Sequence, residues 1–198
     1  MKSQRVAIAS DPAFSFYYYA NRAALMAAGA RIVEFSPMRD AVLPEADFLY
    51  IGGGYPELYR SELSANRSMR ESIRRFIESG KSFYAECGGL MYLSRSIEGA
   101  EMVGIFPTEI QMVDRPVDFG YCEATTLQSS IFGAAGTRLR GHQFHFSRCV
   151  PQSTNPIYRI RQGEREYGEG WVLPNGIASY VHLHFLSNSV AVRHVLES

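Results

Sequence analysis

The chain has 198 residues, and its 20 Lys and Arg balance its 20 Asp and Glu, so the formal net charge is zero. Hydrophobic residues make up 46% of it and charged residues 20%, which is an ordinary globular composition and argues against a binder of nucleic acid or of a membrane surface. Three cysteines are too few for a disulfide framework. We therefore expect a soluble cytoplasmic protein with a single domain over residues 1–198.

The first half of the sequence alternates between short apolar runs and segments with helical spacing of apolar residues. The expected strands are residues 6–9, 31–35, 48–51 and 81–85, and the expected helices are residues 17–28, 61–79 and 90–93. Two of these helices stop at a glycine, which is the usual residue after a helix end. This alternation predicts an α/β fold with a mostly parallel sheet and helices on both faces.

The second half contains strand-like runs separated by Gly, Pro and polar turn residues. The runs are residues 102–112, 120–127, 137–148, 158–161, 170–173 and 177–185, and residues 187–196 are expected to form a closing helix. We interpret these runs as extra, partly antiparallel strands attached to the sheet of the first half.

Cys87 lies where the fourth predicted strand gives way to a helix. A nucleophile on such a turn adopts a strained backbone and needs small residues two positions before and after it, here Ala85 and Gly89. The helix N-terminus would also stabilise a thiolate, and ligands bind open α/β sheets at the carboxyl ends of strands. Most lone cysteines are simply small buried residues, which is how we interpret Cys122 and Cys149. The context of Cys87 favours a nucleophile.

Gly52, Gly53 and Gly54 follow the third predicted strand. Glycines let a backbone approach a ligand closely, but no Gly-Lys-Ser/Thr follows, which disfavours a phosphate loop. The remaining alternatives are a plain tight turn and half of an oxyanion hole, completed by the N–H of Gly88. The nucleophile turn in the next strand–helix unit favours the oxyanion hole.

Four of the five histidines occur in two pairs, His142 with His145 and His182 with His184. Residues two apart in a strand share a face, so the members of the second pair are expected to lie together. One histidine is a candidate for the base that serves the nucleophile, or several form a metal site with Cys149. A hydrogen-bonded core histidine remains the default interpretation for the first pair.

Several segments resemble one known family in the same order along nearly the whole chain. They are residues 8–18 (IASDPAFSFYY), 35–40 (FSPMRD), 52–59 (GGGYPELY), 84–93 (YAECGGLMYL), 141–147 (GHQFHFS) and 179–185 (SYVHLHF). These segments are similar to the glutaminase domain of the cobyrinate a,c-diamide synthase family. The resemblance implies a class I glutamine amidotransferase domain with a flavodoxin-like α/β fold.

The resemblance implies a nucleophile at Cys87, an active-site histidine at His182, and oxyanion or substrate contacts from Gly53, Gly54 and Gly88. Glutamine would be hydrolysed, and the ammonia would amidate the a and c carboxylates of cobyrinate in cobalamin biosynthesis. The partner would be an ATP-binding amidoligase domain or subunit that carries ATP and Mg²⁺. This chain itself would need neither a metal nor a cofactor.

Many related amidotransferases carry a Glu two residues after the histidine, where this chain has His184, and this branch of the family resembles that arrangement, a cysteine–histidine pair without the usual third member. Two features differ from the pattern of the family. The family usually shows Glu where Gln143 stands. The N-terminal ATP-binding domain of the complete synthases has no counterpart in the chain, which is expected to be a free-standing subunit or an excised piece. The alternatives to this function are amidation of a nickel tetrapyrrole precursor, a non-catalytic His-rich metal- or corrinoid-binding module, and a different cysteine hydrolase.

Overall fold

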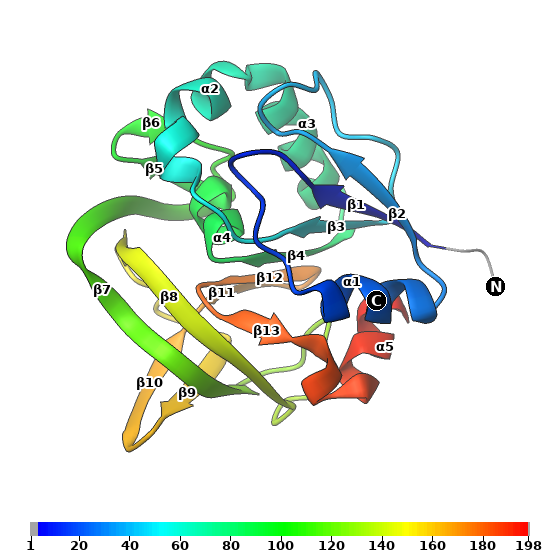
Figure 1. Ribbon diagram of the computed structural model, residues 1–198, viewed down its shortest axis with the longest axis vertical. Coiled ribbons are helices and arrows are strands. Elements are labelled where there is room, and N and C mark those ends of the chain that lie inside the picture. The colour runs from blue at the N-terminus through cyan, green and yellow to red at the C-terminus, as the bar shows by residue number, and fades with distance from the viewer. Residues whose placement is uncertain (1–3, 198) are drawn as a thin grey trace.

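The computed structural model describes residues 4–197, so the predicted domain extends by residues 1–3 and 198 beyond what is described below. Figure 1 shows two β-sheets with helices packed around the first. The strands are β1 (Arg5–Ala9), β2 (Arg31–Phe35), β3 (Phe48–Ile51), β4 (Ser82–Glu86), β5 (Ser94–Ile97), β6 (Ala100–Glu101), β7 (Phe106–Thr126), β8 (Arg138–Val150), β9 (Tyr158–Gln162), β10 (Arg165–Glu169), β11 (Trp171–Leu173), β12 (Gly176–Ser179) and β13 (His182–His184). The helices are α1 (Tyr19–Ala27), α2 (Arg60–Ala65), α3 (Arg67–Glu78), α4 (Gly88–Leu93) and α5 (Ser189–Glu197), with short 3₁₀ turns at Pro56–Tyr59 and Phe185–Ser187.

The first sheet has the strand order β11-β12-β4-β3-β1-β2. All its neighbouring strands are parallel except the edge pair β11 and β12. The apolar runs of the first half supply four of these strands. The structure therefore confirms the mostly parallel sheet that the alternation of strands and helices predicts.

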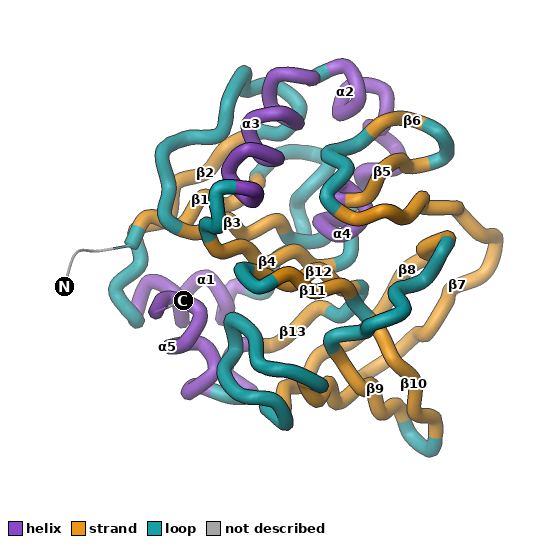
Figure 2. The backbone as a smooth tube through the Cα atoms, turned by 180° about the vertical axis from the view of Figure 1, so that it is seen from behind, coloured by secondary structure: helices purple, strands orange, loops and turns teal. Residues whose placement is uncertain are grey.

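Alternate residues of the central strands enter two different hydrophobic cores. Val6 and Ile8 of β1 pack with α1 and α5, whereas Ala7 and Ala9 pack with α3. Figure 2 shows α2 and α3 on one side of this sheet and α1 and α5 on the other. A sheet covered on both faces buries every residue of its inner strands, which explains why those strands are continuous apolar runs.

One helix of the first half differs from the prediction. The expected helix 61–79 is divided into α2 and α3 at Asn66, whose side chain caps α3 through the Met69 N–H and donates to the carbonyl oxygens of Pro37 and Asp40. The side chain of Asn66 thus competes with helical bonding, as asparagine commonly does at helix ends. Residues 36–47, between β2 and β3, form a loop.

The second sheet is built around a long ribbon of β7 and β8, which Figure 1 shows side by side in green and yellow. Strand β7 joins two of the expected strands, and register shifts between Met112 and Gly120 absorb the intervening Pro116. The last expected strand, 177–185, is divided between β12 in the first sheet and β13 in the second. The chain therefore crosses from one sheet to the other immediately before His182.

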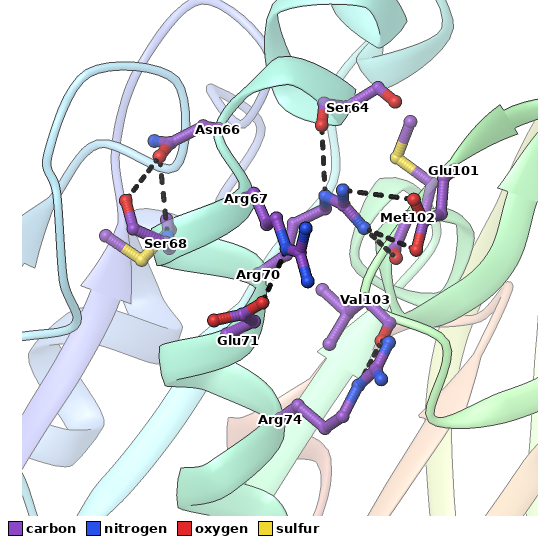
Figure 3. Close-up of polar contacts among 11 residues, drawn as sticks. Ser64, Asn66, Arg67, Ser68, Arg70, Glu71, Arg74, Glu101, Met102 and Val103 are labelled. Carbon is purple, nitrogen blue, oxygen red and sulfur yellow. Dashed lines mark hydrogen bonds and ion pairs between the residues drawn. The ribbon is translucent and has the colours of Figure 1, made fainter.

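Two arginines, one of them buried, connect helix α3 to the hairpin of β5 and β6 and to the segment that follows it (Figure 3). The side chain of Arg70 is 6% exposed, donates to the carbonyl oxygens of Ser64 and Met102, and pairs with Glu101. Arg74 donates to the carbonyl oxygen of Val103. These contacts hold the segment that follows α4 against α3.

Within residues 4–197, none of the helices combines the length and the apolar composition that crossing a membrane requires.

Candidate active site

Cys87 occupies a strained turn between β4 and α4. Its backbone has φ 50° and ψ −103°, a conformation that costs a non-glycine residue roughly 1–3 kcal/mol. A Cβ added at Gly89 would lie 2.2 Å from the carbonyl oxygen of Ile51, so α4 can pass this close to β3 only with glycine there. Ala85, before the turn, is fully buried. The turn therefore has the backbone geometry that raises a nucleophile above a sheet.

The thiol of Cys87 is protonated at neutral pH, contrary to the thiolate expected at a helix N-terminus. Burial, and secondarily the neighbouring charge of Glu86, raises the pKa of Cys87 to about 12, although the Gly88 N–H favours the thiolate. Helix α4 has only six residues, all of them buried. The loss of solvation therefore outweighs the attraction of the short helix end for a negative charge.

His182 is positioned by a strand pair and by one asparagine. It begins β13, directly opposite His142 of β8. On its other side, Asn21 of α1 donates to the carbonyl oxygen of Leu183 at 2.7 Å and accepts from the N–H of Phe185 at 2.8 Å. Asn21 is itself fully buried. These bonds hold the backbone of β13 between the ribbon and α1.

The imidazole of His182 is a neutral base. Its ring stacks on His142 with centroids 4.7 Å apart and meets the edge of the Phe16 ring at 4.9 Å. Burial, with a smaller effect of the neighbouring His142 and His145, lowers the pKa of His182 to about 3. Because the ring carries no proton charge at neutral pH, it can accept a proton from a nearby acid.

The glycine turn after β3 lies against both His182 and the nucleophile turn. A Cβ at Gly53 would lie 2.3 Å from Cε1 of His182, and a Cβ at Gly88 would lie 3.2 Å from the nitrogen of Gly54. Cys87 itself donates its N–H to the carbonyl oxygen of Ser179, at the end of β12. The structure thus brings Cys87, His182 and the three glycines together at the carboxyl ends of β3, β4 and β12.

The two glycines after β3 are not equivalent. The N–H of Gly53 donates to the carbonyl oxygen of Phe16 at 3.1 Å, and the Phe16 N–H donates back at 3.0 Å. Among the hydrogen bonds of residues 4–197, none uses the N–H of Gly54. A Cβ at Gly54, whose φ is +155°, would lie 2.1 Å from the carbonyl oxygen of Ala13. Gly54 and Gly88 are therefore the candidate oxyanion donors, and Gly53 makes room for the imidazole.

The remaining histidines have partners of their own. His145 stacks on Tyr180 with centroids 3.8 Å apart and donates from Nδ1 to the carbonyl oxygen of Ser147. His142 accepts at Nδ1 from the hydroxyl of Tyr18, 2.6 Å away. Cys149 lies in the core near Tyr180. In the described part of the chain, no group of three or more His, Cys, Asp or Glu side chains could hold a metal ion.

Glu86, the residue before Cys87, is a buried acid that the sequence analysis missed. It is 0% exposed and accepts hydrogen bonds from the hydroxyls of Tyr50 at 2.6 Å and Tyr84 at 2.9 Å. Its Oε1 lies 4.0 Å from Nδ1 of His182, and burial raises its pKa to about 7. Tyr50 and Tyr84 are paired neighbours on β3 and β4, and two adjacent tyrosines in core strands are a signal of a buried acceptor.

Comparison with known sequences identifies a family. Residues 5–190 match the CobB/CobQ-like glutamine amidotransferase domain. A cobyrinate a,c-diamide synthase from Listeria monocytogenes is 44% identical over 201 residues, which cover 96% of this chain and 44% of that protein. The synthase of the same name from Salmonella typhimurium is 40% identical, with coverage of 96% and 44%. The chain thus spans less than half the length of these curated relatives.

Comparison with solved structures agrees on the fold. The structure of PurLQS from Thermotoga maritima superposes with a TM-score of 0.70 at 16% identity, covering 98% of this chain and 96% of that one. A crystal structure of a glutamine amidotransferase gives a TM-score of 0.66 at 16% identity, covering 97% of each chain. These likenesses confirm the amidotransferase-like α/β fold. With the match over residues 5–190 and relatives at 40–44% identity, the chain belongs to the CobB/CobQ-like glutamine amidotransferase domain family of enzymes.

Proposed function

We propose that this domain hydrolyses glutamine with Cys87 and His182, and that its ammonia amidates the a and c carboxylates of cobyrinate during cobalamin biosynthesis in the cytoplasm. One observation carries the proposal of glutamine hydrolysis. The strained turn of Cys87 lies at the carboxyl end of β4, in one contact cluster with His182, Gly54 and Gly88. The choice of cobyrinate rests on the curated relatives, which carry that substrate in their names.

The chemistry starts from a neutral thiol and a neutral imidazole. His182 takes the proton of Cys87 while the sulfur attacks the side-chain carbonyl carbon of glutamine. The negative charge that develops on the carbonyl oxygen is stabilised by the N–H groups of Gly54 and Gly88, each worth about 3–4 kcal/mol. The tetrahedral intermediate then expels ammonia, which takes the proton from His182, and water hydrolyses the thioester to glutamate.

Access to this pair requires movement of the groups around it. Cys87 is 6% exposed and His182 is 4% exposed. The Phe16 ring, which meets the edge of His182, is 44% exposed. The segment that carries Phe16 is joined to the glycine turn by the two hydrogen bonds with Gly53. We propose that this segment is displaced when glutamine enters.

The partner that consumes the ammonia is proposed to be an ATP-binding amidoligase domain or subunit, which would also hold Mg²⁺. An exposed aromatic strip, formed by Phe119, Phe144 and Phe146, supports such a docking partner. On the ribbon of β7 and β8, the ring of Phe144 contacts the rings of Phe119 and Phe146. Phe119, Phe144 and Phe146 are 68%, 43% and 38% exposed. Apolar clusters of this kind on a protein surface mark interaction sites.

The nucleophile is tested by release of glutamate from glutamine. We expect Cys87→Ala to abolish release, whereas Cys149→Ala, a change at another buried cysteine, should retain it. A glutamine-like electrophile should add one adduct, located at Cys87 by peptide mass analysis. Undiminished glutamate release from purified Cys87→Ala would reject the proposal.

The docking surface is tested separately. Phe144→Glu should leave glutamate release by the isolated domain within about twofold, because the ring lies on the surface. It should abolish any stimulation by an added cobyrinate amidoligase, because a buried charge without a partner disrupts an apolar interface. Full stimulation of this variant would contradict a docking role for the strip.

A further inference from the structure

The imidazole of His182 has one nitrogen without a partner. Its Nδ1 is buried from solvent and makes no hydrogen bond within the described residues 4–197. Buried polar groups are nearly always satisfied in native proteins, so such an orphan calls for an explanation. The question matters for catalysis because the group bonded to Nδ1 decides whether Nε2 is free to accept a proton.

The nearest ionisable acid to this nitrogen is Glu86, whose Oε1 lies 4.0 Å away. The hydroxyls of Tyr50 and Tyr84 each donate to one of its carboxylate oxygens. A carboxylate oxygen can accept more than one hydrogen bond, so Oε1 can serve both Tyr50 and His182. Glu86 is the last residue of β4 and Cys87 follows it directly, so the end of this strand positions both the acid and the nucleophile.

The position that supplies an acid in related amidotransferases offers none here. His184 stands two residues after His182, and its ring lies against Tyr18 with centroids 5.1 Å apart. An imidazole cannot supply the negative charge that stabilises an imidazolium. An acid that orients His182 would therefore have to come from another element of the fold.

We propose that Glu86 is the positioning residue of this site, accepting a hydrogen bond from Nδ1–H of His182 so that Nε2 is left free to take the proton of Cys87. This inference rests on the proposed glutaminase function. The separation of 4.0 Å is longer than a hydrogen bond, and catalytic hydrogen bonds that are long in a free enzyme tighten in its complex with substrate. Nothing in the family match assigns a role to this residue.

The protonation of Glu86 follows from its surroundings. Burial raises its pKa to about 7, against the opposing effect of hydrogen bonds from the hydroxyls of Tyr50 and Tyr84 and from the N–H of Leu183. The other titratable groups that interact with it are His182, Cys87 and the phenols of Tyr17, Tyr18 and Tyr158. A protonated Glu86 would donate to Nδ1 and place the imidazole proton on Nε2, which disables the base. An ionised Glu86 has the opposite effect and stabilises the imidazolium that forms during the attack.

The experiment compares Glu86→Gln with the wild-type domain by two readouts. In glutamine hydrolysis, we expect kcat to fall about a hundredfold or more with KM changed less than about threefold, because binding groups are untouched. In nitrogen NMR of histidine-labelled protein, we expect His182 to carry its proton on Nδ1 in the wild type and to lose that preference in the variant. An unchanged kcat together with an unchanged tautomer would overturn the proposal.

Two further variants separate positioning from folding. Glu169→Gln is the matched control, because Glu169 also has a carboxylate oxygen shielded from solvent and a pKa raised by burial, to about 8. It should leave the tautomer of His182 unchanged. Glu86→Asp, which keeps the charge on a shorter side chain, should recover part of the lost kcat, and no recovery would count against an electrostatic role.

The wild-type protein gives a test that needs no variant. Lowering the pH from about 9 to about 5 protonates Glu86, so the Nδ1 signal of His182 should shift with a midpoint near 7. A wild-type imidazole that carries its proton on Nε2 at about pH 9, where Glu86 is ionised, would overturn the proposal even if Glu86→Gln failed to fold. Failure of the wild type to hydrolyse glutamine would instead refute the proposed function, while the NMR readout would still test the contact with Glu86.

Discussion

Substitution of Gly53 by alanine tests the geometry of the site most directly. The new Cβ would lie 2.3 Å from Cε1 and 3.2 Å from Nδ1 of His182. An ordinary contact between carbon atoms is about 3.5 Å or longer, so the imidazole must move by about 1 Å. Gly53 cannot easily move instead, because two hydrogen bonds tie its backbone to Phe16. Misplacement of a catalytic group by about 1 Å costs about a hundredfold in rate.

The assay is kcat for glutamate release, measured together with the melting temperature. Overpacking costs about 1–3 kcal/mol, or roughly 2–12 °C in a chain of this size, so Gly53→Ala should remain folded. Gly176→Ala is the matched control, since its Cβ would lie 2.3 Å from Cδ1 of Phe83, at the opposite end of the sheet. It should destabilise the domain without lowering kcat. A folded Gly53→Ala variant with kcat within about threefold of the wild type would refute the reasoning.

Three further predictions concern the thiol of Cys87, the contacts of Arg70 and the ionisation of Glu169. Since the pKa of Cys87 is raised to about 12, its alkylation by iodoacetamide should be slow at neutral pH and should rise without a plateau up to about pH 10, whereas a plateau near pH 7 would contradict the buried thiol. Arg70→Ala should lower the unfolding free energy by about 1–3 kcal/mol in urea, because it strands the carbonyl oxygens of Ser64 and Met102. Arg67→Ala, which removes an exposed pair with Glu71, should lower the unfolding free energy by about 0.5 kcal/mol or less. Equal losses in the two variants would argue against a stabilising role for the contacts of Arg70. For Glu169 the pKa rises from 4.5 to about 8, so the unfolded chain loses this proton first and the unfolding free energy should fall as pH rises through that window. Glu169→Gln should flatten this slope, and an unchanged slope would exclude Glu169 as its source.

The central strands of the first sheet are predictable from the sequence because each of them is a short continuous apolar run. The apolar runs at residues 6–9 and 48–51 are buried on both faces of the sheet, and each becomes a strand. The division of the expected strand 177–185 is not predictable in this way. Residues 176–183 are all buried, so no exposed residue marks the crossing. The break is instead made by a distant group, since Glu169 accepts the N–H of Tyr180 where a ladder would otherwise continue.

Some features of the candidate site are likewise predictable from the local sequence, and others are not. The turn of Cys87 is predictable from Ala85 and Gly89 because the requirement is steric and local. The ionisation of the thiol is not, because it depends on burial by the whole fold. The difference between Gly53 and Gly54 depends on Phe16, and the position of Glu86 depends on Tyr50, both far away in the sequence. Residue types identify the chemistry, whereas protonation and hydrogen-bond partners come from tertiary packing.

Burial also decides how the proton must leave Cys87. Burial raises the pKa of Cys87 and lowers that of His182, so both shifts disfavour a separated thiolate and imidazolium in this site. In the proposed reaction, proton transfer therefore accompanies the attack, and negative charge appears on the glutamine oxygen beside Gly54 and Gly88 rather than fully on sulfur. The same argument requires a counter-charge for the imidazolium, and Glu86 is the buried acid beside it.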